Sequence, residues 1–182
     1  ARLGFEKRRV LGMAGVLDSA RMAYFISEKM GGGIHDVRCM VLGGHGDSMV
    51  PMPQFSTVDG VAIPALLPKD QIDALNHRTK HGGAEIVNLL KTGSAYYAPS
   101  AAAVAMAKSI LRDERRLLPC AAHLEGQYGL RDIYVGAPCV LGTNGVERVV
   151  ELELDDAGAA NLHASAAAIR KDLETLKAKG LL

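Results

Sequence analysis

Two apolar runs in the second half of the chain, Ile133–Leu141 and Val146–Leu154, constrain the fold most. They are separated by Thr143-Asn144-Gly145, and an Asn-Gly pair supplies the positive φ angles that a tight hairpin turn needs. Over 150–154, apolar residues alternate with glutamates, which buries one face of a strand and leaves the other in water. The pattern therefore predicts an antiparallel hairpin.

Helical patterns flank this hairpin on both sides. Apolar residues recur at helical spacing over 13–30, and Gly31-Gly32-Gly33 is expected to end that helix. A second strong pattern covers Pro99–Arg112, with the proline in the first turn. Asp155 or Asp156 is expected to cap a last helix that runs to about residue 179. Two weaker helical patterns lie at 68–76 and 83–91.

Short runs of β-branched and apolar residues predict the remaining strands, at 37–42, around Asp59-Gly60 and at 117–123. Strands and helices therefore do not alternate strictly along the chain, as they would around a parallel sheet. We expect an α+β fold with a largely antiparallel sheet packed against long helices. At 182 residues, the whole chain 1–182 has the length of one domain.

The composition argues against several classes of function. A formal net charge of +1, from 21 basic and 20 acidic residues, predicts no binding to nucleic acid or to anionic membranes. No apolar run is long enough to span a bilayer. Cys39, Cys120 and Cys139 are odd in number and widely spaced, so we expect free thiols in a reducing cytoplasm. His77 and His81 lack a third ligand at supporting spacing, so no metal site is expected.

Two short motifs carry side chains suited to acid–base chemistry on an anionic substrate. In GVLDSAR, residues 15–21, Asp18 and Arg21 are three apart and project from one face of a helix. In GGHGDSMVP, residues 43–51, glycines around His45 leave the ring open to a ligand at the end of a strand. Taken alone, each motif also has a purely structural explanation. Asp18 and Arg21 fit a surface ion pair, and His45 fits a histidine that only forms hydrogen bonds within a turn.

Together the two motifs fit the oxidation of a hydroxy acid, which must lose a hydroxyl proton as well as a hydride. Histidine suits the proton transfer because its ordinary pKa, about 6.5, lies near working pH. The carboxylate of Asp18 would fix the tautomer of His45 and stabilise the imidazolium. The planar guanidinium of Arg21 matches a substrate carboxylate in a two-point contact. No metal is required, because the imidazolium and the arginine supply positive charge.

The combination of GVLDSAR and VLGGHGDSMVP resembles the C-terminal domain of the lactate/malate dehydrogenase family. GGAEIVNLLKTGSAYYAP, at 82–99, and EGQYGLRDIYVG, at 125–136, resemble the same family, so the likeness covers essentially the whole chain. The resemblance implies that Asp18 orients His45 as the catalytic pair and that Arg21 binds the substrate carboxylate. It also implies NAD as cofactor, a 2-hydroxy acid or 2-oxo acid as substrate, and a cytoplasmic homo-oligomer.

Further residues are assigned by the same resemblance. Gly93, Ser94 and Ala95 are expected to line the pocket for substrate and nicotinamide, and Met49 to lie near the nicotinamide ring. Ser94 fits a helix or turn cap equally well. Gly44, Met49 and Ala95 are similar to the malate branch of the family, in which (S)-malate and oxaloacetate are interconverted.

The sequence departs from the family in one large respect. No glycine-rich phosphate loop follows an N-terminal strand, so the family's Rossmann half is expected to be missing and the isolated chain to be inactive or nearly so. Three alternatives remain open: a lactate or other 2-hydroxy-acid dehydrogenase domain, a non-catalytic assembly fragment that associates through the 13–30 and C-terminal helices, and a histidine-based hydrolase. The hydrolase is disfavoured because the sequence has no GxSxG nucleophile motif.

Overall fold

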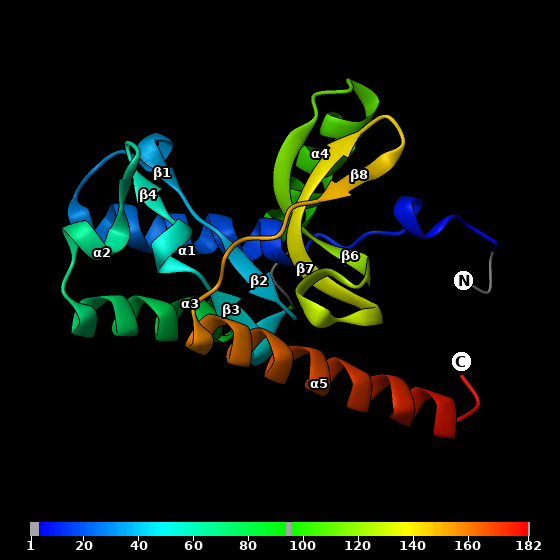
Figure 1. Ribbon diagram of the computed structural model, residues 1–182. Helices are drawn as coiled ribbons and strands as arrows, with labels where there is room; N and C mark the ends of the chain where they lie inside the picture. Colours follow the sequence, from blue (N-terminus) through cyan, green and yellow to red (C-terminus); the bar gives the residue numbers. More distant parts are fainter. Residues whose placement is uncertain (1–3, 94–95, 182) are drawn as a thin grey trace.

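The computed structural model describes residues 4–93 and 96–181 and contains two antiparallel sheets and several helices (Figure 1). The predicted α+β class is confirmed. The helices are α1 (Ala14–Met30), α2 (Ile63–Leu66), α3 (Lys69–Leu90), α4 (Tyr97–Leu111) and α5 (Asp156–Ala178). The strands are β1 (Val37–Arg38), β2 (Val41–Gly43), β3 (Met49–Pro51), β4 (Thr57–Val58), β5 (Val61–Ala62), β6 (Arg116–Glu125), β7 (Arg131–Gly142) and β8 (Gly145–Val149).

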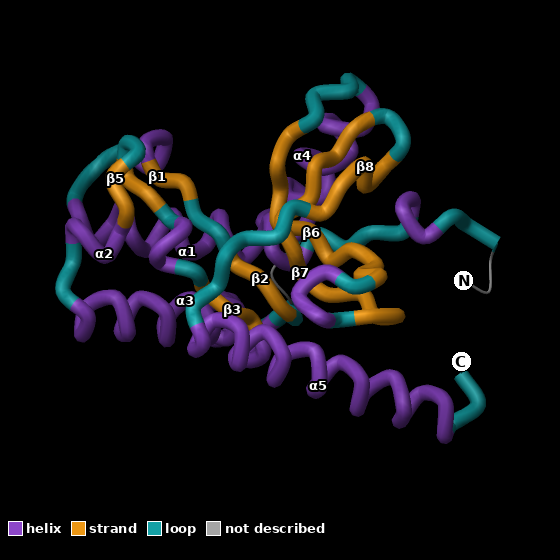
Figure 2. The backbone as a smooth tube through the Cα atoms, viewed as in Figure 1, coloured by secondary structure: helices purple, strands orange, loops and turns teal. Residues whose placement is uncertain are grey.

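The larger sheet is built around the long strand β7, which pairs with β6 along most of its length. Strand β8 folds back on β7 across the predicted turn, and β2, which itself pairs with β3, meets β7 at Gly43 and Gly136. Figure 2 shows the small sheet, in the order β1-β4-β5, lying apart from it near α2. The larger sheet thus brings the end of β2, just before His45, to the middle of the molecule.

Three apolar clusters hold these elements together. The first joins α1 to α2, α3, β1, β2 and β3, and it includes Met22 and Ile26. The second packs α5, through Leu162, under the tip of the β6–β7 hairpin. The third packs α4, through Met106, against the open end of the same hairpin. Because α1 contributes to the first cluster and contacts β6 and α4 as well, it is the central element of the fold.

Several predicted boundaries are confirmed. Helix α1 ends at Gly31, which takes the left-handed conformation with a φ of 66°. The hairpin forms across Thr143 and Asn144, although only Gly145 adopts a positive φ there. The carboxylate of Asp155 caps α5 by accepting a hydrogen bond of 2.7 Å from the Gly158 amide. No helix among the described residues is long and apolar enough to cross a membrane.

The two weak helical patterns at 68–76 and 83–91 were wrong as separate helices, because α3 runs through the intervening residues without a break. Its buried positions, Ile72, Leu75, Thr79 and Gly82, follow helical spacing and face α1. The apolar periodicity fades in the sequence where the stripe is continued by a threonine and a glycine. Tertiary packing of this stripe therefore maintains the helix through the Gly82-Gly83 pair, despite the low helix propensity of glycine.

The predicted strand at 37–42 divides into β1 and β2, which belong to different sheets. Between them the amide of Met40 donates to the hydroxyl of Ser56 instead of to a strand. The second arm of the hairpin, predicted to reach Leu154, ends at Val149. Shortly after it, the amide of Leu152 donates to the hydroxyl of Tyr128, which draws the chain away from β7. Side-chain hydrogen bonds, which periodicity does not report, account for both differences.

The three cysteines are free thiols. Cys120 and Cys139 are buried, whereas Cys39 is half-buried at the edge of the first cluster. Burial raises the pKa of the Cys39 and Cys139 thiols to about 12, and it also raises the pKa of Cys120. All three therefore remain protonated near neutral pH and act as apolar packing groups.

Candidate active site

The carboxylate of Asp18 lies at the centre of the candidate site. It projects from the second turn of α1 and is completely buried. Its Oδ2 lies 3.1 Å from Nδ1 of His45, and its Oδ1 lies 3.5 Å from Nη1 of Arg21. A buried carboxylate is costly unless cationic or N–H groups compensate it, and these two side chains do so. The spatial meeting of the two sequence motifs is therefore present in the structure.

Close packing of α1 explains the burial of Asp18. A Cβ atom on Gly15 would lie 2.4 Å from the carbonyl oxygen of Pro119 and 2.8 Å from that of Val41, so glycine allows α1 to rest on both strands. The hydroxyl of Ser19, which is also buried, accepts a hydrogen bond of 3.0 Å from the Val41 amide. Helix α1 is thereby tied to β2 just before the loop that carries His45.

The loop with His45 is anchored from a second side by α5. The amide of Gly44 donates a hydrogen bond of 2.8 Å to the hydroxyl of the buried Ser165. His45 itself has a side chain that is 49% exposed. Its Nδ1 must carry the proton in the bond to Asp18, because an ionised carboxylate only accepts. Nε2 has no hydrogen-bond partner among the described residues, so this nitrogen is free to exchange a proton with a ligand.

The electrostatic surroundings favour the protonated form of His45. The hydrogen bond to Asp18 raises the pKa of His45 above its ordinary value, and the charge of Asp18 adds to the effect. Partial burial and the positive charge of Arg21 act in the opposite direction but are outweighed. With Nδ1 bonded to a carboxylate and Nε2 unbonded among the described residues, the ring can hold or release a proton at Nε2, as a general acid–base group must.

The side chain of Arg21 is 8% exposed and lies between Asp18 and helix α3. It also borders a largely apolar cavity of about 380 Å³ formed by α1, α3 and the start of α4. His45 does not line this cavity. The guanidinium contacts Asp18 only at the limit of hydrogen-bonding distance, and within the described residues Asp18 is its one hydrogen-bond partner.

Of the other predicted site residues, the structure describes Met49 and Gly93. Met49 is completely buried in the first apolar cluster together with Met22 and Val41, so its side chain does not reach an open surface of this chain. Gly93 is exposed just after α3, with a φ of 93°. Ser94 and Ala95 lie outside the described residues. The structure therefore brings together Asp18, Arg21 and His45, and the roles of the remaining positions stay predictions.

Sequence reasoning missed three residues that support the site: Ser19, Ser165 and Gly82. Ser165 lies on the buried face of α5 beside Leu162 and Ala166, and a serine within such an apolar stripe is a signal that a backbone group needs a partner. Ser19 stands next to Asp18 in the motif but carries no distinguishing pattern. Gly82 lies between the two helical patterns that the sequence predicts at 68–76 and 83–91, although a glycine at a buried helical position can also mark a close approach.

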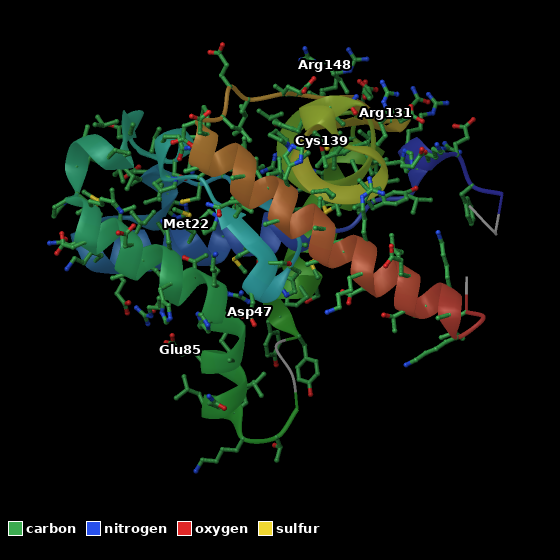
Figure 3. All side chains as sticks on the ribbon, turned by 60° about the horizontal axis from the view of Figure 1, so that its bottom comes forward. Met22, Asp47, Glu85, Arg131, Cys139 and Arg148 are labelled. Atoms are coloured by element: carbon green, nitrogen blue, oxygen red, sulfur yellow. The ribbon has the colours of Figure 1, made fainter. Side chains whose placement is uncertain are left out.

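No three His, Cys, Asp or Glu side chains within residues 4–93 and 96–181 are grouped so that they could hold a metal ion. His77 and His81 stack their rings on α3, with 4.3 Å between the centroids. Nε2 of His81 lies 4.0 Å from a carboxylate oxygen of Asp47, two residues beyond His45. Figure 3 shows Asp47 close to α3, the helix that carries Glu85.

Relatives of known identity match almost the whole chain. A malate dehydrogenase of Roseiflexus castenholzii is 56% identical over 174 residues, which cover 96% of this chain and 56% of that protein. The structure of malate dehydrogenase from Salinibacter ruber is 46% identical, with a TM-score of 0.92, and the match covers 97% of this chain and 59% of that one. The chain therefore spans little more than half the length of these relatives.

A lactate dehydrogenase is similar as well. The enzyme from Cryptosporidium parvum, solved with lactic acid and β-nicotinamide adenine dinucleotide, is 39% identical, with a TM-score of 0.92 over 96% of this chain and 56% of that one. Residues 15–179 match the model of the lactate/malate dehydrogenase alpha/beta C-terminal domain. This range contains Asp18, Arg21 and His45. The chain therefore belongs to the lactate/malate dehydrogenase family.

Proposed function

We propose that this chain is the catalytic and substrate-binding part of an NAD-dependent malate dehydrogenase, which interconverts (S)-malate and oxaloacetate. The observation that carries the proposal is the contact of His45 with the buried Asp18, beside Arg21. The two malate dehydrogenases from Roseiflexus castenholzii and Salinibacter ruber support the choice of reaction.

His45 moves the proton of the reaction. In the direction of malate oxidation, neutral His45 accepts the proton of the substrate hydroxyl at Nε2, while Nδ1–H stays bonded to Asp18. As hydride leaves the carbon, the electron pair of the broken O–H bond forms the second bond between that carbon and the oxygen. The resulting imidazolium is stabilised by the buried carboxylate, which water does not screen. In the reverse direction the imidazolium protonates the oxygen of the keto group.

Arg21 holds the carboxylate next to the reacting carbon. Its guanidinium offers two parallel N–H groups to a carboxylate, which fixes orientation as well as distance. Asp18, which orients the His45 ring, and Arg21, which binds the substrate carboxylate, lie less than one turn apart on α1. One helix therefore positions both the ring and the substrate. The positive charge of Arg21 lowers the pKa of His45, and the negative charge of a bound substrate offsets this effect.

NAD, when bound, accepts or donates the hydride. Of the two proposed neighbours of the nicotinamide end, Gly93 is exposed and open to a ligand, whereas the side chain of Met49 is completely buried and does not fit a direct contact with the ring. Every strand pair among the described residues is antiparallel, so they form no βαβ unit of the kind that holds a pyrophosphate. We propose that a Rossmann domain outside these 182 residues binds the rest of the nucleotide, and that the isolated chain has little or no activity.

Three positions favour malate over lactate as substrate. Gly44, Met49 and Ala95 resemble the malate branch, whereas the lactate branch usually carries Glu, Ser and Thr at these places. At the first of them, an added Cβ would lie 2.3 Å from the hydroxyl of Ser48, so the loop as folded here fits glycine. Lactate or another 2-hydroxy acid is the alternative substrate. We further propose a cytoplasmic location, which the three free thiols support, and self-association into a homo-oligomer.

Steady-state kinetics test the proposal. In the full-length dehydrogenase that we propose contains this chain, NADH oxidation should be at least about 100-fold faster with oxaloacetate than with pyruvate, expressed as kcat/KM, since a site built to bind a polar group rejects the analogue that lacks it. Equal or reversed values would assign the site to lactate or another 2-hydroxy acid. The isolated chain, assayed with NAD and malate, should show little or no activity if it is only the catalytic part. Full activity would show that it is a complete enzyme. A full-length protein that associates without any turnover would support the assembly fragment instead.

A further inference from the structure

Helix α3 crosses the side chain of Arg21 at Gly82, and it leaves no space there for a methyl group. A Cβ atom built on Gly82 would lie 2.5 Å from Cδ and 3.1 Å from Nε of Arg21, and 3.2 Å from a ring carbon of Phe25. Two carbon atoms that are not bonded do not approach to 2.5 Å in a packed interior. A side chain at position 82 and the present position of Arg21 therefore exclude each other.

The backbone of α3 is held against α1 up to this crossing. One turn before Gly82, the guanidinium of Arg78 lies 4.0 Å from the centre of the Phe25 ring and pairs with Glu28 of α1. Glu85, which also belongs to α3, accepts hydrogen bonds of 2.9 and 3.2 Å from the same guanidinium and so fixes the Arg78 side chain in its place against α1. The buried stripe of α3 adds apolar contacts to α1. Arg21 is therefore the group that would have to move.

The position of Arg21 has little freedom in the other direction. Its side chain is 8% exposed, and its Nη1 is directed toward Asp18, 3.5 Å from Oδ1. Gly82 thus restricts the stem of the side chain, and Asp18 restricts the guanidinium at its end. A displacement of Cδ shifts the whole guanidinium, because the atoms beyond Nε form one rigid plane.

The neighbouring glycine provides a contrast. A Cβ on Gly83 would lie 3.6 Å from Nη2 of Arg21, which is an ordinary van der Waals contact. Both glycines lie inside α3 and both weaken its helix propensity relative to alanine. The two positions therefore share the same secondary structure, and only the first lies against the stem of Arg21.

We propose that Gly82 is a positioning residue for substrate binding: because it carries no side chain, it sets the place of the Arg21 guanidinium. The kinetic consequence rests on the proposed function, in which Arg21 binds the substrate carboxylate, whereas the steric relation to Arg21 does not. Gly82 acts through Arg21 and has no contact of its own with the substrate.

The kinetic test compares Gly82→Ala with Gly83→Ala in the full-length dehydrogenase, using oxaloacetate and NADH. We expect G82A to lower kcat/KM by about 10- to 100-fold, mainly through KM, since small misplacements of a binding group cost this much. G83A should stay within about twofold of the parent enzyme, because its methyl group makes only an ordinary contact. Equal values for both variants would overturn the proposal.

A second measurement does not depend on activity. Thermal melting of G82A, G83A, Arg21→Ala and the double variant R21A/G82A reports whether the new methyl group collides with Arg21. Helix propensity should raise the melting temperature of G83A by roughly 1–3 °C, and G82A should fall below it. Without the arginine side chain, the methyl group at position 82 has nothing to collide with. The melting temperature of R21A/G82A should therefore exceed that of R21A by the gain that helix propensity gives G83A. If G82A melts low or fails to fold and the double variant does not recover, the collision is not with Arg21 and the proposal fails.

The two arms also separate this inference from the proposed function. A parent enzyme without activity on oxaloacetate or pyruvate would refute the proposed function, while the melting temperatures would still decide whether Gly82 positions Arg21. An active parent enzyme with equal G82A and G83A kinetics would refute the role of Gly82 alone.

Discussion

Among the histidines that lie beside carboxylates, His45 and His123 have opposite surroundings. At His45 the carboxylate of Asp18 is completely buried, the ring is 49% exposed, and 3.1 Å separates the bonded atoms. At His123 the ring is 10% exposed, whereas Glu125 and Asp132 are 65% and 85% exposed and lie 3.7 and 3.8 Å away. Nδ1 of His123 has no hydrogen-bond partner among the described residues.

The difference shows that closeness to a carboxylate does not by itself make an acid–base site. A buried carboxylate acts on the ring without screening by water, and an exposed ring nitrogen can reach a ligand. The surroundings of His45 meet both conditions. The His123 ring instead packs edge-on against Tyr134, and its two carboxylates also pair with Lys7. We therefore assign a structural role to His123.

Removal of each imidazole tests this comparison with the largest expected effect. His45→Asn should lower kcat for oxaloacetate reduction in the full-length enzyme by about 10²- to 10⁴-fold, the usual worth of a general acid–base group. His123→Asn should change kcat by less than about threefold and act on stability instead. Similar losses of kcat in both variants would remove the distinction between the two sites.

Removal of the buried charge should have the next largest effect. Asp18→Asn keeps the shape of the side chain but loses the charge, so we expect kcat to fall by at least about 100-fold, as a neutral amide no longer fixes the ring or stabilises the imidazolium. Glu125→Gln, at the exposed carboxylate beside His123, is the matched control and should leave kcat unchanged. Circular dichroism confirms that both variants are folded. Retention of full activity by Asp18→Asn would contradict the proposed proton transfer.

The smallest effect is expected from the hydroxyl groups that support each region. Ser165 accepts from the Gly44 amide next to His45, and Ser109 accepts from Arg116 and donates to the Leu141 carbonyl in the β6–β7 sheet. Alanine at either position should cost about 1–2 kcal/mol of folding free energy, as expected for a lost buried hydrogen bond. Only Ser165→Ala should also lower kcat, by a few-fold. A loss of kcat in Ser109→Ala of the same size would show that general stability, and not the loop, limits activity.

Much of the site follows from local sequence. The spacing of Asp18 and Arg21 fixes their common helix face, and glycines around His45 indicate an open loop after a strand. The contact between the two motifs could be anticipated from their chemistry and from the family resemblance. The distance itself depends on tertiary structure, because Ser19 ties α1 to β2 and Ser165 reaches the loop from α5, far along the sequence.

The fold was predictable where periodicity alone determines the element. Helices α1, α4 and α5 and the β7–β8 hairpin have complete patterns with caps or turn residues. The division of 37–42 into β1 and β2 depends on which strand pairs with which, and the continuity of α3 depends on its packing against α1. Neither piece of information is present in a local window of sequence. Gly82 illustrates the limit, because it marks a close approach inside α3 at a position that lies outside both predicted helical patterns.

The central claim is that the buried Asp18 controls the protonation of His45, and an NMR titration of the His45 ring tests it most directly. The hydrogen bond to Asp18 raises the pKa of His45 in the folded protein above the unfolded value of about 6.5. The stabilising contact is therefore fully present below that value and is lost as pH rises through the folded pKa. Oxaloacetate reduction, which needs protonated His45, should decline over the same range, while malate oxidation should rise.

We predict a titration midpoint above 6.5 for His45 in the parent protein, and a lower midpoint in Asp18→Asn. A His45 midpoint that is unchanged by Asp18→Asn would contradict the account.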